Sequence, residues 1–319
     1  MSLLKRASSN GVPKVPFKQR FLAWWEGVEA PAAPPWPKQA RVAEAEAEAS
    51  PQPIKLEPWE NAVIRVRHAI WGEGFRWPGG VPFVLELVKP FAINSSMSML
   101  DFGCGAGGPA RAIAKEFDVW ITGIERDRDQ VEVGKLLSTK AGLERKAEII
   151  AYDADHFVSR SGGFDCILSM DTLFRFESRE SILARLENGL KTRGQLTVCD
   201  YTRGDKTAPD DPLIAGALGA DSPALWTKGE YEKRFNDLKF DLRVSEDITD
   251  KFRAMALMGL HRVTQTLEGK AVIRTFPAAF MAEVGGWERK LAAIEAGVLK
   301  IYRFYGIKMG STSLMSNWS

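Results

Sequence analysis

Apolar and polar residues alternate along most of this chain with two periods, one typical of strands and one typical of helices. Between residues 98 and 201, short apolar runs are separated by longer segments with apolar residues on one helical face. The strand-like runs are SMLDFG (98–103), DVWITGIE (118–125), AEIIAYD (147–153), FDCILSMD (164–171) and QLTVCDY (195–201). The helical segments between them cover 107–117, 128–143 and 178–190. Strands joined by helical crossovers predict a parallel sheet that is covered on both faces.

The same two patterns continue on either side of this region. Further helical segments are expected at 59–72, 80–91, about 205–235 and about 250–300, and further strands at 239–249 and 304–311. We therefore predict an α/β fold with a doubly wound, mostly parallel, seven-stranded sheet. The helices before the first strand would form an N-terminal cap, and those after the fifth strand a lid.

The first 53 residues have a different composition. Residues 1–25 carry five basic residues and no acidic one, and residues 30–53 are rich in Pro, Ala and Glu. Such a segment buries too little apolar area to offset its ordering entropy. We expect a flexible arm over 1–53 and a single domain over 54–319. Phe17, Phe21, Trp24 and Trp25 lie at helical spacing beside basic residues, so residues 14–27 could touch a membrane surface or a protein partner, or pack back on the domain.

Composition narrows the class of protein without identifying it. Apolar residues make up 45% and charged residues 26% of the 319 residues, and the formal net charge is +2, which gives no general attraction to nucleic acid. No run of about 18 apolar residues is present that could span a membrane. Cys104, Cys166 and Cys199 lack metal-ligand spacing and stand in apolar runs. They indicate reduced thiols in a cytoplasmic protein without a metal site.

A glycine-rich loop follows the first predicted strand. It contains Gly103, Gly105, Gly107 and Gly108, which match the dinucleotide pattern, although glycines at a strand-to-helix turn are a weak signal alone. Asp101 stands two residues before the first glycine, where a carboxylate would face a pyrophosphate unfavourably. It suits a ligand with a sulfonium and an amino group. No Lys-Ser/Thr pair follows, which excludes a nucleoside-triphosphate loop.

Further candidate ligands follow the next strands. Glu125 ends the second strand, where a carboxylate accepts hydrogen bonds from both ribose hydroxyls in methyl-donor and NAD pockets alike. Asp155 follows the third strand and could accept from an adenine amino group beside the Ala154 amide. Asp155 could instead cap a helix. Met170, at the end of the fourth strand, is assigned to the same pocket.

These motifs resemble the class I S-adenosylmethionine-dependent methyltransferases, and within them the phosphoethanolamine N-methyltransferase-like small-molecule group. IWGEGFRWPGG (70–80) is similar to the lead-in of that group, VCDYTRG (198–204) to its fifth-strand signature, and GGWERKLAAIEAGVLKIYRFYGIK (285–308) to its C-terminal tail. The resemblance covers roughly residues 59–308. It implies a Rossmann-like methyltransferase fold, S-adenosylmethionine as the cofactor, and transfer of its methyl group to N or O of a small or lipid-like acceptor.

The chain departs from that group at its catalytic pair. The histidine expected after the fourth strand is replaced by Arg175, and the N-terminal tyrosine is missing, since the first tyrosine is Tyr152 and the nearest aromatic residue is Trp59. We therefore assign no catalytic residue. Asp171, Arg175 and Tyr201 are expected to border the acceptor, with Arg175 binding an anionic group.

Two other functions stay open. The chain could be a non-catalytic binding protein with a methyltransferase fold, or, less favoured, an NAD-dependent oxidoreductase. The segment AMALMGL (254–260) would supply a soft apolar acceptor lining if it faced the site, but ordinary core packing is the favoured interpretation at such spacing.

Overall fold

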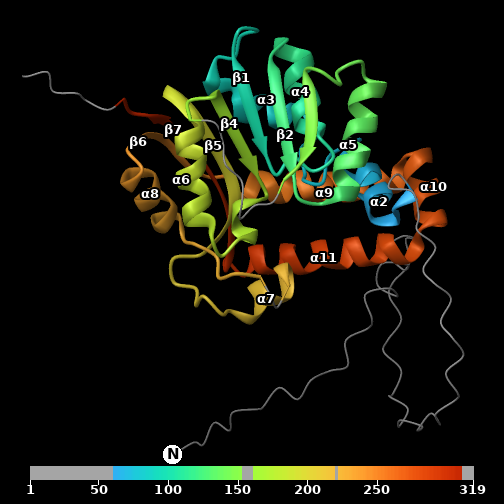
Figure 1. The fold of residues 1–319 in the computed structure, drawn as a ribbon. Helices are drawn as coiled ribbons and strands as arrows, with labels where there is room; N and C mark the ends of the chain where they lie inside the picture. Colours follow the sequence, from blue (N-terminus) through green and yellow to red (C-terminus); the bar gives the residue numbers. More distant parts are fainter. Residues whose placement is uncertain (1–59, 153–160, 220–221, 311–319) are drawn as a thin grey trace, which may run out of the picture. The chain divides into compact units, whose positions relative to one another are not determined.

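The computed structural model describes residues 60–152, 161–219 and 222–310, and the description below concerns these ranges. A seven-stranded sheet with the strand order β3-β2-β1-β4-β5-β7-β6 forms the centre (Figure 1). Its strands are β1 Ser98–Phe102, β2 Trp120–Glu125, β3 Ala147–Ala151, β4 Phe164–Met170, β5 Leu190–Arg203, β6 Phe240–Asp247 and β7 Leu299–Lys308. Strands β1 to β5 are parallel, and β7 runs antiparallel to both β5 and β6. The doubly wound, mostly parallel fold predicted from the sequence is confirmed.

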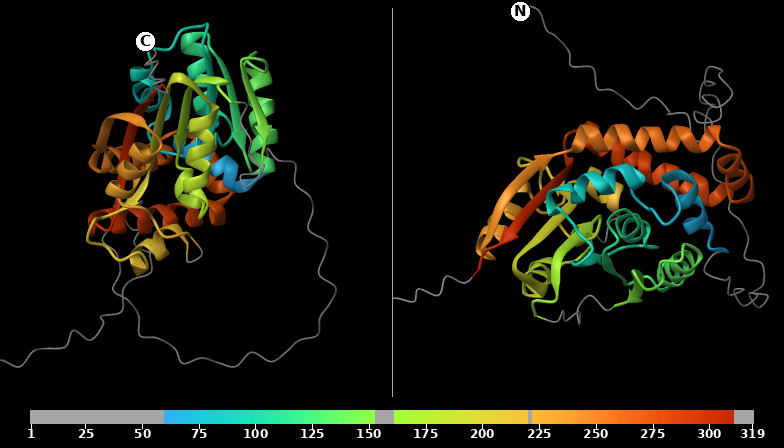
Figure 2. Two further views of the ribbon diagram at one scale, coloured as in Figure 1. Left: turned by 60° about the vertical axis from the view of Figure 1, so that its left-hand side comes forward. Right: turned by 90° about the horizontal axis from the view of Figure 1, so that it is seen from above.

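Helices cover both faces of the sheet (Figure 2). The helices α3 Gly80–Val88, α4 Gly108–Phe117 and α5 Arg128–Lys140 lie on one face, and α6 Arg179–Gly189 and α8 Lys228–Asp237 lie on the other. This division follows from the strand order, because right-handed crossovers that run outward in opposite directions from the centre of a sheet place their helices on opposite faces. Strand β1 is buried at four of its five residues, as expected for a strand covered on both sides.

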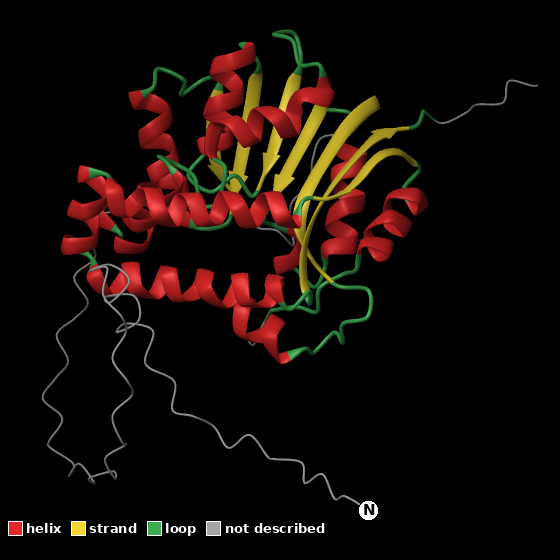
Figure 3. Cartoon of the chain, turned by 180° about the vertical axis from the view of Figure 1, so that it is seen from behind, coloured by secondary structure: helices red, strands yellow, loops and turns green. Residues whose placement is uncertain are grey.

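The remaining helices lie across the carboxyl ends of the strands (Figures 1 and 3). They are α2 Ala62–Trp71, α7 Pro212–Leu218, α9 Thr249–Gln265, α10 Leu267–Thr275 and α11 Pro277–Glu295. Helix α2 packs against α9, α10 and α11, so the cap and the lid form one helical layer. None of the helices in the described ranges combines the length and apolar character needed to cross a membrane.

Two boundaries of the predicted elements are wrong. Strand β7 begins at Leu299, whereas the sequence places helix there and the strand from residue 304. Strand β5 begins at Leu190 rather than at residue 195. In both cases the strand extends beyond its strongest apolar run: β5 pairs with β7 as far as Arg203 opposite Leu299, and Leu190 pairs with Phe164 of β4.

The sheet brings the ends of β1 and β4 side by side. Helical crossovers leave these two strands in opposite directions, which opens a crevice at their carboxyl ends where doubly wound sheets bind ligands. Residues that precede β1 and residues of α11, between β6 and β7, reach the same crevice through the helical layer.

Candidate functional site

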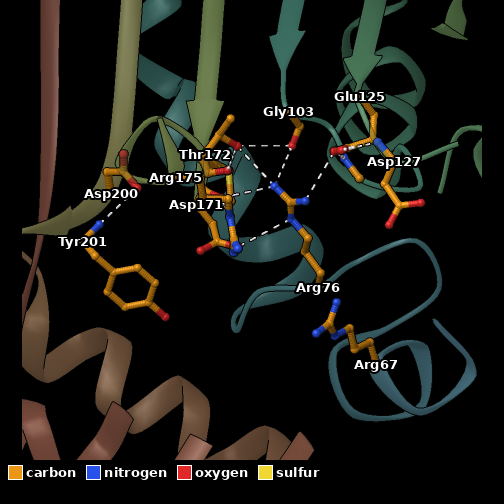
Figure 4. A network of polar contacts seen from close by, with 12 residues as sticks. Arg67, Arg76, Gly103, Glu125, Asp127, Asp171, Thr172, Arg175, Asp200 and Tyr201 are labelled. Atoms are coloured by element: carbon orange, nitrogen blue, oxygen red, sulfur yellow. Dashed lines mark hydrogen bonds and ion pairs between the residues drawn. The ribbon is translucent and has the colours of Figure 1, made fainter. Parts of the chain in front are cut away.

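A cavity of about 180 Å³ lies at the carboxyl ends of the central strands. Five of its lining residues, Gly103, Glu125, Asp171, Arg175 and Tyr201, are among those predicted from the sequence. The others are Arg67, Arg76, Trp77, Arg126, Asp127, Tyr152, Thr172, Phe176, Glu283, Trp287 and Lys290. They come from the helical cap, the ends of β1 to β5 and the lid helix α11, so distant segments of the chain meet here. Figure 4 shows the residues from the cap and from the ends of β1, β2, β4 and β5.

The glycine loop turns sharply from β1 into α4. Gly103, Gly105 and Gly107 all have positive φ, at 79°, 57° and 72°. A Cβ atom on Gly103 would lie 2.2 Å from the Thr172 side chain, and one on Gly107 would lie 2.6 Å from Ile149. Both the backbone conformation and the close approach therefore require glycine at these positions.

Glu125 joins the end of β2 to this loop. One carboxylate oxygen accepts a hydrogen bond from the Gly105 amide at 2.9 Å, and the other accepts from the amides of Arg126 and Asp127 at 2.9 and 3.1 Å. The side chain is almost fully buried. The acid is thus held at the glycine loop by three backbone donors, in the place that the sequence assigns to a ribose-binding carboxylate.

Asp101 lies in the core of the site without a complete set of partners. Its side chain is 1% exposed, and its Oδ2 atom has no hydrogen-bond partner among the described residues. Burial raises its pKa from 3.8 to about 7; the nearby Glu125 carboxylate adds to this rise, and Arg76 opposes it. An unsatisfied buried carboxylate oxygen beside the glycine loop fits a site for a ligand with a positively charged amino group.

This pKa shift predicts how Asp101 affects stability. The pKa of Asp101 is higher in the folded state than in the unfolded state. Its contribution to the free energy of unfolding is therefore fully present below about pH 4 and is lost as pH rises through about 7. We expect Asp101→Asn to gain roughly 4 kcal/mol in unfolding free energy relative to the wild type between pH 4 and pH 8. Urea denaturation at several pH values measures this, with the exposed Asp210→Asn as the control. A difference that does not change with pH would contradict the shift.

Asp171 is held between two arginines at the end of β4. Its carboxylate lies 2.9 Å from Arg175 Nη2 and 3.5 Å from Arg76 Nε, and its backbone oxygen accepts hydrogen bonds from both side chains. Asp171 also has a φ of 50°, which is strained for a residue with a side chain. Arg175 lies over the Phe174 ring at 4.5 Å, and its side chain is 39% exposed.

Asp200 in β5 supports this loop, and the sequence analysis did not identify it. Its Oδ2 accepts hydrogen bonds from the Phe174 amide at 2.8 Å and from the Tyr231 hydroxyl at 2.9 Å. Burial raises its pKa to about 7, with Asp171 adding to the rise. The neighbouring Tyr201 ring stacks on Trp77, with the ring centres 5.5 Å apart, and burial raises the pKa of its phenol well above 10. Tyr201 therefore stays protonated and forms a wall of the cavity.

The lid helix α11 contributes residues that the sequence did not suggest. Glu283 pairs with Arg67 at 3.0 Å, whereas Lys290 forms no ion pair with any described carboxylate and lies 4.9 Å from the centre of the Trp287 ring. Burial lowers the pKa of Lys290, although Asp171 and Glu283 oppose this. The GW-x-RK motif, which contains Trp287 and Lys290, was the available signal for this part of the site.

Several predicted residues do not line the cavity. Asp101, Gly105, Gly107 and Met170 are buried and are not among its lining residues. Ala154 and Asp155 are outside the described residues, as are residues 14–27 and Trp59. Residues 254–260 do not line this cavity, so the condition for an apolar acceptor lining is not met. Met255, Leu257 and Met258 border a separate apolar groove between α9 and the segment from α2 to α3, because α9 turns this face away from the cavity.

Comparisons with known proteins agree with this architecture. A family model described as a methyltransferase domain matches residues 93–230. Phosphoethanolamine N-methyltransferase 3 of Arabidopsis thaliana is 28% identical over 72% of this chain and 46% of its own length. A sterol 24-C-methyltransferase of Gibberella zeae is 25% identical over 73% of this chain and 64% of its own length.

A solved structure shows the same fold. Phosphoethanolamine N-methyltransferase 2 of Haemonchus contortus, in complex with phosphomonomethylethanolamine and S-adenosylhomocysteine, superimposes with a TM-score of 0.69. It is 24% identical and covers 77% of this chain and 57% of that chain. The chain spans about half the length of the phosphoethanolamine relatives it matches. The family match and the relatives confirm the resemblance to methyltransferases, and the superposition confirms the fold.

Proposed function

We propose that this chain, with its methyltransferase domain, is an enzyme that transfers the methyl group of S-adenosylmethionine to a nitrogen or oxygen of a small anionic acceptor. The observation that supports the donor assignment is the hydrogen bond from the Gly105 amide to Glu125, which holds the acid that we assign to the ribose beside the glycine loop. The unsatisfied Asp101 oxygen beside this loop fits the donor's amino group. The family-model match over residues 93–230 supports the same assignment.

The bound donor would supply a methyl group on a sulfonium. In this proposal Asp101 and the backbone of Gly103 to Gly107 hold the methionine part, and Glu125 holds the ribose. Met170, Ala154 and Asp155 stay predicted contacts of the donor. An intracellular, cytoplasmic location is supported by Cys104, Cys166 and Cys199, which are all buried free thiols.

The acceptor side of the cavity has a positive character. Arg175 is partly exposed to it, and Lys290 brings a second cation without a paired carboxylate in the described ranges. An arginine and a lysine that line the same cavity fit an acceptor with a carboxylate or phosphate group. The charged lining favours a small acceptor over a lipid-like one.

Positioning would supply most of the catalysis. No histidine of the described ranges lines the cavity, and the phenols of Tyr152 and Tyr201 have raised pKa values, so neither is ready to act as a base near neutral pH. Methyl transfer from a sulfonium is an in-line displacement, and an acceptor that is already nucleophilic needs correct orientation above all. The aromatic residues that line the cavity, together with Arg175 and Lys290, would orient the acceptor.

The acceptor assignment predicts a specific loss. Arg175→Ala and Lys290→Met should each weaken binding of the anionic acceptor about tenfold, as expected for loss of one charge-assisted hydrogen bond, while the affinity for S-adenosylhomocysteine stays near that of the wild type. Exposed Arg128→Ala and Lys115→Met are matched controls. The readout is KM in the methyl-transfer assay below. Unchanged KM values would remove the two cations from the acceptor site.

The experiment that tests the function measures transfer of labelled methyl from S-adenosylmethionine to a panel of amines, phenols, carboxylates and phosphorylated amines. We expect turnover only with acceptors that carry an anionic group. The absence of turnover across the panel, together with tight donor binding, would favour a non-catalytic binding protein. Turnover of a neutral acceptor alone would overturn the anionic class but not the methyl transfer.

A further inference from the structure

Arg76 places a guanidinium in the part of the cavity assigned to the donor (Figure 4). Its Nη1 lies 3.3 Å from Glu125 Oε2, and its Nη2 donates to the backbone oxygens of Gly103 at 3.1 Å and Asp171 at 3.2 Å. A further bond of 3.2 Å joins Nη2 to the Thr172 hydroxyl. The side chain is only 20% exposed. Arg76 thus connects the ends of β1, β2 and β4 across the crevice.

Arg76 contacts groups that the proposed donor would also have to contact. The Glu125 oxygen that Arg76 contacts is the one bonded to the Gly105 amide. Gly105 itself is covered, because a Cβ atom built on it would lie 3.5 Å from the Arg76 Cδ. The guanidinium therefore lies over the glycine loop and beside the ribose-binding acid at once.

Charge holds Arg76 in this position. Burial works against its charged form, but the carboxylates of Glu125 and Asp171 more than offset this, so the pKa of Arg76 is raised. The donor also carries positive charge, on its sulfonium and its amino group. A guanidinium held in the same small cavity would repel these positive groups of the donor.

The volume of the cavity also argues against Arg76 and the donor occupying it together. With Arg76 in place, the described residues enclose about 180 Å³, whereas pockets for ligands of the donor's size usually measure about 300–1,000 Å³. An extended ligand that reaches from Gly103 to Glu125 would overlap the guanidinium. Arg76 has to leave this position before such a ligand can enter.

We propose that Arg76 is an internal counter-ion of the donor site, which neutralises its acids in the free protein and lowers the affinity for the donor because it must first be displaced. This inference rests on the proposed function, since it takes the glycine loop and Glu125 as the donor site. The apparent dissociation constant then equals the intrinsic one divided by the fraction of molecules in which Arg76 has moved away.

The site is built to remain folded without Arg76. Glu125 keeps three backbone donors, from Gly105, Arg126 and Asp127. Asp171 keeps its ion pair with Arg175 at 2.9 Å. Replacement of Arg76 therefore removes one partner from each acid and leaves the remaining ones in place.

The test is titration calorimetry of the full chain with S-adenosylmethionine and with S-adenosylhomocysteine. We compare the wild type with Arg76→Gln, which removes the charge, with Arg76→Ala, which removes the side chain beyond Cβ, and with the exposed control Arg128→Gln. Near-ultraviolet circular dichroism, to which the adjacent Trp77 contributes, checks that each variant is folded. We expect both Arg76 variants to bind the two ligands about tenfold more tightly than the wild type, and the control to match the wild type.

Each result of the titration either supports or overturns the inference about Arg76. Tighter binding by both folded Arg76 variants, or binding by these variants alone, supports the inference. Equal binding overturns it, and weaker binding overturns it too, because Arg76 would then contact the bound donor; in both cases the proposed donor site stands. The absence of binding in the wild type and in both variants overturns the donor site itself, and the inference with it.

Discussion

Replacement of Glu125 by glutamine is expected to weaken binding of S-adenosylmethionine and S-adenosylhomocysteine about 30-fold. The carboxylate would accept hydrogen bonds from both ribose hydroxyls, and loss of its charge is worth about 2 kcal/mol. Glutamine keeps the size of the side chain but only one acceptor oxygen, so it can accept either from the Gly105 amide or from the amides of Arg126 and Asp127. Calorimetry measures the change, and Glu132→Gln on the exposed face of α5 is the matched control.

A ligand analogue makes this prediction specific to the ribose. The 2′,3′-dideoxy form of S-adenosylhomocysteine lacks both hydroxyls, so the wild type and Glu125→Gln should bind it with nearly equal affinity. The difference between the two ligands isolates the interaction of Glu125 with the hydroxyls, as in a double-mutant cycle. An equal loss for both ligands would show that Glu125 acts through the structure of the loop.

Asp200→Ala should have the largest effect on stability, a loss of about 3 kcal/mol in unfolding free energy. The substitution leaves the buried Phe174 amide and Tyr231 hydroxyl without their acceptor, and each such group costs about 1–3 kcal/mol. Removal of a buried carboxylate with a raised pKa offsets part of this cost. Urea denaturation at pH 7 gives the value.

Asp200→Asn separates the hydrogen bonds from the charge. It keeps one acceptor oxygen, so it should cost less than Asp200→Ala, and the exposed Asp210→Ala should change stability little. Because the Phe174 amide fixes the loop that carries Asp171 and Arg175, we also expect Asp200→Ala to raise the KM of the anionic acceptor. A loss below about 0.5 kcal/mol would mean that these hydrogen bonds do not stabilise the fold.

The sequence predicted the sheet well because its strands combine apolar runs with turn signals. All seven strands are present, and Glu125 was placed correctly because the carboxyl ends of parallel strands meet at one edge. The ends of β5 and β7 were harder to predict, because the antiparallel pairing between them extends beyond the apolar runs. Such pairing depends on residues about a hundred positions away.

The site was only partly predictable. Gly103 and Glu125 belong to short motifs with fixed offsets from a strand, so spacing alone located them. Arg76 lies in an irregular loop, where the direction of a side chain depends on the tertiary contacts of the loop, and its partners are 27 to 96 residues away. Lys290 belongs to a segment that resembles the methyltransferase tail, but the face of α11 that meets the cavity is determined by the packing of this helix.

Residues 254–260 show why an apolar helical pattern does not identify a ligand-binding surface. Methionines and leucines at helical spacing show that a helix has an apolar face, but not which neighbour that face meets. In α9 these residues border the groove near α3, and Leu257 and Met258 are 44% and 64% exposed. The acceptor side of the cavity is instead charged and aromatic.

Binding of the cofactor tests the central claim most directly. Calorimetry of the wild-type chain should show that S-adenosylmethionine and S-adenosylhomocysteine each bind more tightly than NAD. In the proposed site the buried Asp101 carboxylate beside the glycine loop would attract the donor's amino group and repel a pyrophosphate. Tighter binding of NAD would contradict the methyl-donor assignment and make an oxidoreductase the leading candidate.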